Sequence, residues 1–249
     1  AGHDTTHPAL PGARPAVGRG GHPPSPPLAL VGDMGGGGMF LALGVLAAVL
    51  HARETGVGQV VDASIVDGAA SLCTAFYGLA ASGQWRSERG SNVLDSGAPF
   101  YDVYECGDGE WISIGPIEGR FFAGLLQRLD IDPAVIGKQY DVQAWPRAKK
   151  AIAEAFRTRT REEWCERLEG TDVCFAPVLD FAEAPGHPHL RARGTFLEVD
   201  GVVQPAPALR FSRTPSANPT PPQAPDAARA LHGWLEADER ARWKALLGD

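Results

Sequence analysis

The chain has 249 residues, 44% of them hydrophobic and 21% charged, which is the composition of a soluble globular protein with one large or two small domains. Its net charge of −7 argues against a nucleic-acid surface or a polybasic membrane anchor, so neither kind of partner is expected. The longest apolar run, Met39 to Leu50, is too short to span a bilayer, and a cytoplasmic location is the default expectation. The four cysteines have no CxxC or zinc spacing, so no metal site is expected.

The first third of the chain alternates loops rich in glycine and proline with apolar segments. Residues 8–27 predict an extended loop, and the glycine turn after it leads into a helix from about Met39 to Arg53. That helix is apolar nearly all round, which predicts that it is buried. Gly56 is expected to end this helix as a C-terminal cap. A strand over 59–66 and a helix over 68–81 capped by Asp67 are expected to follow.

The middle and the end of the chain contain clearer patterns. The polar stretch 83–99 predicts a linker and a domain boundary. Residues 100–114 predict a β-hairpin, because Asp108-Gly109 separates two segments rich in aromatic and β-branched residues. The remaining expected elements are a helix over 120–129, two charged helices within 144–168, a hairpin over 195–203, an irregular proline-rich stretch over 214–226 and a closing amphipathic helix over 227–247.

One carboxylate stands directly ahead of a glycine run. Asp33 precedes Gly35, Gly36, Gly37 and Gly38, which lead straight into the long apolar segment. Glycines let a backbone approach a ligand closely, and the first turn of a helix stabilises an anion, so this arrangement suits enolate chemistry. The alternative is that Asp33 is an ordinary N-cap and that the glycines form a flexible turn. A nucleotide phosphate loop is excluded, because the Gly-Lys-Ser/Thr ending is missing.

Other ionisable residues have both a functional and an ordinary interpretation. His3 in Gly-His-Asp and Glu118 in Gly-Pro-Ile-Glu stand beside turns, as Asp33 does, and each alone is a weak candidate. His187 and His189 could ligate a metal, but Pro188 between them favours a loop. Asp62 and Asp67 could pair as catalytic carboxylates, although turn and capping roles suit their positions better.

Several motifs in order carry a resemblance to a known family. They are Gly-His-Asp at 2–4, Gly-Asp-Met-Gly-Gly-Gly-Gly at 32–38, His-Ala-Arg-Glu-Thr-Gly at 51–56, Gly-Gln-Val-Val-Asp-Ala at 58–63, Ala-Pro-Phe-Tyr at 98–101, Gly-Pro-Ile-Glu at 115–118 and His-Leu-Arg-Ala-Arg-Gly at 189–194. Together they resemble the α-methylacyl-CoA racemase branch of the family III CoA-transferase (CaiB/BaiF) superfamily. The resemblance covers essentially the whole chain and is strongest from Leu30 to Gly119.

The resemblance implies a racemase that moves the α-proton of 2-methylacyl-CoA thioesters without a cofactor, the CoA thioester being its substrate. It places the catalytic set on His3, Asp33 and Glu118, with Asp33 and His3 on opposite faces of the α-carbon and Glu118 holding the imidazole. The residues that it assigns to substrate and CoA binding are Gly2, Asp4, Gly32, Gly35, Gly36 and Gly37. Candidate acyl groups include branched fatty acids, sterol side chains and aryl-propionyl groups.

The resemblance also implies an α/β fold with part of a Rossmann-like large domain and a small α+β domain. It divides the chain into part of the large CoA-binding domain at 1–82, the small domain at 83–185 and a return to the large domain at 186–249. Family members form interlocked homodimers, so Glu118 is expected to act across the interface. A family segment ahead of Gly-His-Asp is expected to be missing from this chain.

Two other functions stay open at this point. A family III CoA-transferase would use Asp33 as a nucleophile, and the presence of the His and Glu partners favours proton transfer over acyl transfer. The other alternative is a truncated chain that is inactive or only dimerises.

Overall fold

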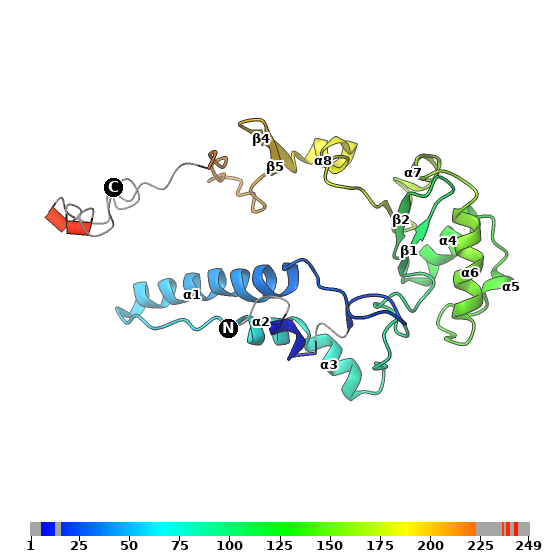
Figure 1. The fold of residues 1–249 in the computed structure, drawn as a ribbon, viewed down its shortest axis with the longest axis horizontal. Helices are drawn as coiled ribbons and strands as arrows, with labels where there is room; N and C mark the ends of the chain where they lie inside the picture. Colours follow the sequence, from blue (N-terminus) through cyan, green and yellow to red (C-terminus); the bar gives the residue numbers. More distant parts are fainter. Residues whose placement is uncertain (1–5, 13–15, 223–235, 237, 240–241, 244–249) are drawn as a thin grey trace. The chain divides into compact units, whose positions relative to one another are not determined.

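The computed structural model describes residues 6–12, 16–222, 236, 238–239 and 242–243 (Figure 1). The chain divides into two compact units, residues 1–178 and 179–249. The domain boundaries expected from the family, at 82/83 and 185/186, stay predictions. Both sheets of the described residues are antiparallel, so no parallel sheet of a Rossmann-like domain is found among them.

The first unit begins with helices. A short 3₁₀ helix, η1 (His7–Ala9), precedes the π-helix η3 (Leu30–Met39), which continues into α1 (Phe40–Thr55). Gly56 ends α1 in the left-handed conformation (φ 75°), and its N–H donates to the Ala52 carbonyl at 2.8 Å. The C-terminal cap expected at this glycine is therefore confirmed.

The expected burial of α1 is wrong for the described residues, because none of its side chains is buried. Leu43, Leu46 and Leu50 are 65%, 63% and 63% exposed. The helical stretch Leu30–Thr55 has 26 residues with a mean hydropathy of 1.7 over its most apolar window, which is 11% buried, so by length and composition it could cross a membrane. The expectation that this region is too short to span a bilayer rested on Met39 to Leu50 alone, and the helix is longer than that run. The absence of a membrane partner stays a prediction.

The segment after α1 differs from its prediction in two ways. The strand expected over 59–66 is absent, and Val60 is 94% exposed, since no other described strand pairs with this segment. The helix that follows begins earlier than expected and is broken at Cys73 into α2 (Ile65–Leu72) and α3 (Thr74–Ala81). Ser64 takes the N-cap position, so Asp67 lies in the first turn instead of capping.

The hairpin expected over 100–114 is confirmed. Strand β1 (Asp102–Glu105) pairs antiparallel with β2 (Trp111–Ile114), and β2 pairs with β3 (Phe175–Pro177). Because side chains alternate along a strand, Asp102 and Tyr104 of β1 lie on the same buried face as Ile112 and Ile114 of β2.

Four helices accompany this sheet: α4 (Gly119–Arg128), α5 (Pro133–Ile136), α6 (Trp145–Phe156) and α7 (Arg161–Leu168). The helices predicted over 120–129 and within 144–168 are therefore confirmed. Thr160 caps α7 through a capping box with Glu163. One hydrophobic core joins the sheet to α4, α6 and α7, and its fully buried large side chains include Phe100, Ile112, Leu125, Ile152, Phe156 and Leu168.

The second unit contains η4 (Ala184–Gly186), α8 (Pro188–Arg193) and a hairpin of β4 (Phe196–Val199) and β5 (Val202–Pro205). The hairpin was predicted from the sequence, whereas the loop expected around His187 and His189 is instead the start of α8. Residues 214–222 carry no helix or strand, as predicted. The closing helix predicted over 227–247 lies largely outside the described residues.

Candidate active site

Asp33 lies in the first turn of η3 with its side chain exposed. The helix begins at Leu30, after Ala29 in the left-handed conformation (φ 62°), and the Met34 N–H donates to the Ala29 carbonyl at 3.0 Å in π-helical register. The sequence placed the helix start too late, because glycine is a poor helix former and the apolar pattern begins only at Met39. Asp33 therefore lies inside the helix start and does not cap it, and the glycine turn is part of the helix.

The glycines after Asp33 bring η3 against α2. Gly32 and Gly36 are buried, and a Cβ atom added to Gly36 would lie 2.7 Å from a backbone nitrogen of α2. A Cβ atom added to Gly68 of α2 would lie 1.8 Å from the Gly36 carbonyl oxygen, so the two backbones touch. Gly35 and Gly37 face side chains at the two ends of α2. These contacts give the glycines a packing role, and their role in substrate binding stays a prediction.

The loop that carries Glu118 is held in place on several sides. The Gly115 N–H donates to the Cys174 carbonyl at 2.9 Å, and the Gln139 side-chain amide donates to the Ile117 carbonyl at 2.8 Å. Pro116 is fully buried between these two anchors. Cys174 and Gln139 therefore hold the backbone of the Gly-Pro-Ile-Glu motif in place without a ligand.

The carboxylate of Glu118 does not take part in this anchoring. Glu118 stands at the N-cap of α4 in an extended conformation, and its carbonyl accepts the N–H groups of Phe121 and Phe122, both at 3.0 Å. Its side chain makes no capping bond and is exposed. Burial raises the pKa of the Cys174 thiol, and the negative charge of Glu118 adds to that rise, so the two side chains are within electrostatic reach.

The structure does not assemble the whole predicted catalytic set. His3, with Gly2 and Asp4, lies outside the described residues. Asp33 belongs to η3, which packs against α1 and α2, whereas Glu118 begins α4 beside the three-stranded sheet. Among the described residues, no group of three His, Cys, Asp or Glu side chains is arranged to hold a metal ion.

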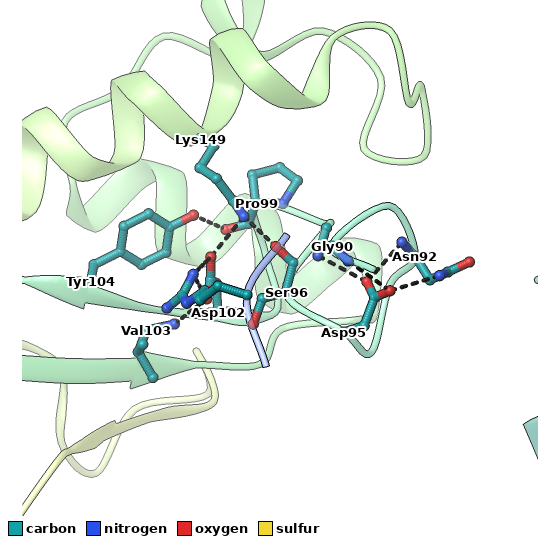
Figure 2. A network of polar contacts seen from close by, with 11 residues as sticks. Gly90, Asn92, Asp95, Ser96, Pro99, Asp102, Val103, Tyr104 and Lys149 are labelled. Carbon is teal, nitrogen blue, oxygen red and sulfur yellow. Dashed lines mark hydrogen bonds and ion pairs between the residues drawn. The ribbon is translucent and has the colours of Figure 1, made fainter. Parts of the chain in front are cut away.

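The sequence reasoning missed a buried carboxylate, Asp102, whose polar contacts are shown in Figure 2. The Asp102 side chain is 2% exposed and forms ion pairs with Arg19 at 2.8 Å and Lys149 at 2.7 Å. Lys149 also donates to the Ser96 carbonyl. Asp102 is opposite Ile114 in the β1–β2 register, four residues before Glu118. The strict alternation of β1 could have revealed it, since Asp102 falls on the core face, where a charge needs partners.

An apolar cavity of about 420 Å³ is lined by residues 11–12 and 16–17 on one side and by α3 on the other. Val31 of η3 and Leu72 of α2 both line it. Asp33 is two residues beyond Val31, so its side chain leaves the helix on the other side. The cavity therefore does not open at the Asp33 carboxylate.

Comparison with known proteins places the chain in a family. The family model described as CoA-transferase family III matches residues 1–243. Alpha-methylacyl-CoA racemase from Mus musculus is 42% identical over 218 residues, which cover 87% of this chain and 57% of that protein. The protein of the same name from Homo sapiens is 40% identical over 212 residues, covering 84% and 56%. The chain thus spans less than three fifths of the length of these two relatives.

A solved structure supports the same fold. The crystal structure of a CaiB/BaiF family protein from Brucella suis aligns with a TM-score of 0.74 at 19% identity, covering 95% of this chain and 63% of that one. The mixed helix and strand content agrees with it, and the predicted α/β class of this family is confirmed. The chain belongs to the CoA-transferase family III.

Proposed function

We propose that the protein acts as an isomerase that interconverts (2R)- and (2S)-2-methylacyl-CoA thioesters. The observation that carries the proposal is its similarity, over more than four fifths of the chain, to two proteins named alpha-methylacyl-CoA racemase. The chain has a His, an Asp and a Glu in the three motifs on which the racemase branch depends. A CoA-transferase needs only the Asp of that set.

In the proposed reaction, one base removes the α-proton and the electron pair moves onto the thioester oxygen. A second group, protonated and on the opposite face, then gives its own proton to the α-carbon, which inverts the centre. We assign these two roles to His3 and Asp33, so the exchange balances with no organic cofactor and no metal. The assignment of His3 rests on sequence alone.

Glu118 is suited to orient a histidine. Its backbone is held by the anchors around Gly115 and Ile117, while its carboxylate is exposed and free of a capping bond. A carboxylate on a fixed backbone can accept the N–H of an imidazole, select its tautomer and strengthen it as a base. This combination of a rigid loop and an available oxygen supports a positioning role for Glu118.

The helix that contains Asp33 is suited to stabilise the enolate. η3 and α1 form one continuous helical stretch, Leu30–Thr55, whose N-terminal end carries partial positive charge. A negative charge that develops near its first turn is stabilised more than the neutral thioester, which lowers the barrier to proton removal.

We further propose a homodimer that works on branched fatty acyl-CoA in the cytoplasm, with Glu118 acting across the interface. The exposed leucines of α1 support a partner, because burying them against a second copy would remove apolar surface from water. Because the net charge of the chain is −7, the anionic CoA would have to be bound by a local group of basic residues.

The test is deuterium exchange at the α-carbon of (2S)-2-methylbutanoyl-CoA in D₂O, followed by NMR and by chiral analysis of the product. The protein should incorporate deuterium and form the (2R) thioester. Asp33→Asn and Glu118→Gln should each slow inversion by about 100-fold or more, the size typical of lost acid-base catalysis. Asp67→Asn is the matched control, because Asp67 is also an exposed carboxylate in a helical first turn.

Two results would contradict the proposal. Inversion that survives Asp33→Asn unchanged would overturn the role given to Asp33. The other is no exchange, together with a covalent acyl group on Asp33 that hydroxylamine releases, which would identify a CoA-transferase. Isothermal titration with CoA separates both from an inactive fragment, which would bind no CoA.

A further inference from the structure

The apolar cavity beside α3 has features of a ligand site that the proposed reaction does not use. Its wall is formed by large apolar side chains, including Leu72, Phe76, Trp85 and Leu94, and the Phe76 and Trp85 rings meet edge to face at 5.1 Å. A volume of about 420 Å³ lies within the range of cavities that hold small organic ligands. Apolar walls of this size favour a hydrocarbon chain over a polar molecule.

The polar groups of the wall already have partners inside the protein. The Tyr77 hydroxyl donates to the Pro11 carbonyl at 3.0 Å. The Asp95 carboxylate accepts the Gly90 N–H at 3.0 Å, and it accepts both the N–H and the side-chain amide of Asn92 at 2.8 and 2.7 Å (Figure 2). A ligand in the cavity therefore does not need polar groups along its length to satisfy these atoms.

A second, smaller cavity of about 200 Å³ adjoins the first and is basic. The two cavities share Gly12, Ala16, Trp85 and Asp95, and the smaller one adds Arg86, Ser87 and Arg89. The chain as a whole has a net charge of −7, so two arginines at one cavity are a local departure from its acidic surface. The acidic groups nearby are Asp95, which four donors solvate, and the exposed Glu88.

The two arginines are held in place by the backbone around them. The Arg89 guanidinium donates to the carbonyls of His22 and, at 3.3 Å, Arg19. The Arg86 N–H donates to the Asn92 side-chain oxygen at 2.8 Å, and the Asn92 amide donates back to the Arg86 carbonyl at 2.9 Å. This pairing fixes the backbone of Arg86 and leaves its side chain exposed to bind an anion.

We propose that this pair of cavities binds a fatty carboxylate, with its chain in the apolar cavity and its carboxylate at Arg86 and Arg89. The shared wall requires a ligand whose anion is attached directly to its hydrocarbon chain. An acyl-CoA does not meet this requirement, because a long pantetheine arm separates its phosphates from its acyl group. The class of reaction that supplies such a ligand is thioester hydrolysis, which converts an acyl-CoA and water to a free acid and CoA.

The test uses two cysteines of the chain as reporters. Cys73 lines the apolar cavity, whereas Cys174 is exposed beside the Glu118 loop and serves as the internal control. Iodoacetamide labelling of each is followed by mass spectrometry with decanoate, decan-1-ol, butanoate or decanoyl-CoA. Decanoate should slow labelling of Cys73 but not of Cys174. Decan-1-ol should need about a tenfold higher concentration for the same protection, as expected for one lost charge-assisted hydrogen bond.

Variants separate the two halves of the site. Arg86→Glu should abolish the preference for decanoate over decan-1-ol, and Arg53→Gln, an exposed arginine in the last turn of α1, should preserve it. Ala80→Trp should fill the cavity and remove protection by both ligands, and Ala80 is exposed, so the fold should tolerate it. The proposal is wrong if decanoate leaves Cys73 labelling unchanged, if butanoate or decanoyl-CoA protects Cys73 as well as decanoate does, or if Arg86→Glu keeps the preference.

Discussion

The helices η3 and α1 are more apolar in sequence than the helices around the three-stranded sheet, yet only the sheet helices bury large apolar side chains among the described residues. In α1, no described side chain is buried, and its leucines are about as exposed as surface residues. In the sheet body, Phe100, Ile112 and Phe156 are wholly shielded from water. The difference is one of partners. Four helices pack with the sheet, whereas α1 has apolar residues on all sides and, among the described residues, mainly contacts η3.

This contrast shows that apolar content indicates which surfaces need cover and does not say what covers them. The sheet body is stabilised by side chains that interlock within the same 75 or so residues, from Ala98 to Val173. The contact between η3 and α2 is instead made by backbone at glycines. The first kind of contact should be sensitive to lost volume, and the second to added volume.

The largest expected effect is the loss of a core aromatic ring. Phe156 is fully buried and its ring contacts Tyr104 and Trp164 at centroid distances of 5.5 and 5.2 Å. Phe156→Ala should lower the free energy of unfolding by about 3–5 kcal/mol, measured by urea denaturation. Leu46→Ala in α1 should change it by less than about 0.5 kcal/mol, because Leu46 is 63% exposed. A large effect of Leu46→Ala would mean that α1 is covered in solution and would break the comparison.

The next effect tests the glycine contact. Gly68→Ala should push η3 away from α2, because its methyl group would lie 1.8 Å from the Gly36 carbonyl oxygen. We expect a local loss of about 1–3 kcal/mol, seen as faster hydrogen exchange in both helices but not in the sheet body. Gly78→Ala in α3 is the control, since a methyl group there has no neighbour within 4 Å and should stabilise the helix slightly. Equal effects of the two variants would show that the contact is loose.

The sequence predicted the elements whose cause is local and missed those that depend on a distant partner. The hairpin over 100–114 was predicted because its cause is local: Asp108-Gly109 turns the chain between two strand-forming segments. The cap at Gly56 was predicted for the same reason. The strand expected over 59–66 failed, because a β-branched segment becomes a strand only when a neighbour pairs with it.

The candidate site was predicted in part. The motifs identified the family and directed attention to Asp33 and Glu118, which are both exposed in the structure. The helical conformation of Gly35 to Gly38 was missed, because their packing on α2 outweighs their low helix propensity. Asp102 was also missed. Strand alternation places it on the core face, but no spacing rule identifies its partners Arg19 and Lys149, which lie far away in the chain.

The stability of the sheet body should fall at high pH, because its core contains a buried thiol, Cys106. Burial raises the pKa of the Cys106 thiol to about 11, with a smaller contribution from the charge of Asp108. The unfolded chain loses this proton near pH 9 while the folded chain keeps it, so stability is fully present below about pH 9 and falls as the pH rises towards 11. At pH 10 we expect a loss of about 1 kcal/mol, less than the full shift implies because pH 10 lies between the two pKa values.

The measurement for this prediction is urea denaturation at pH 8 and pH 10. Cys106→Ala should unfold more easily at pH 8 because of its lost volume, but it should lose less stability on going to pH 10 than the parent protein. The pKa of the exposed Cys174 is raised less than that of Cys106, so Cys174→Ala should change the pH dependence less than Cys106→Ala does and serves as the control. An identical pH dependence for parent and Cys106→Ala would contradict the prediction.

The smallest effect concerns the side-chain cap at the N-terminus of α7. The Thr160 hydroxyl accepts the Glu163 N–H at 3.2 Å, and the Glu163 carboxylate accepts the Thr160 N–H at 2.8 Å. Thr160→Ala should therefore cost about 0.5–1 kcal/mol, measured by thermal and urea unfolding, while Thr160→Ser should keep most of the cap. α1 has no such side-chain cap at its start, since η3 leads directly into it, and its helical state depends on that continuity. If Thr160→Ala were neutral, α7 would be stabilised by the packing of Trp164 and Leu168 and not by its cap. The sheet body and the η3–α1 helices would then differ in their cores but not in how their helices begin.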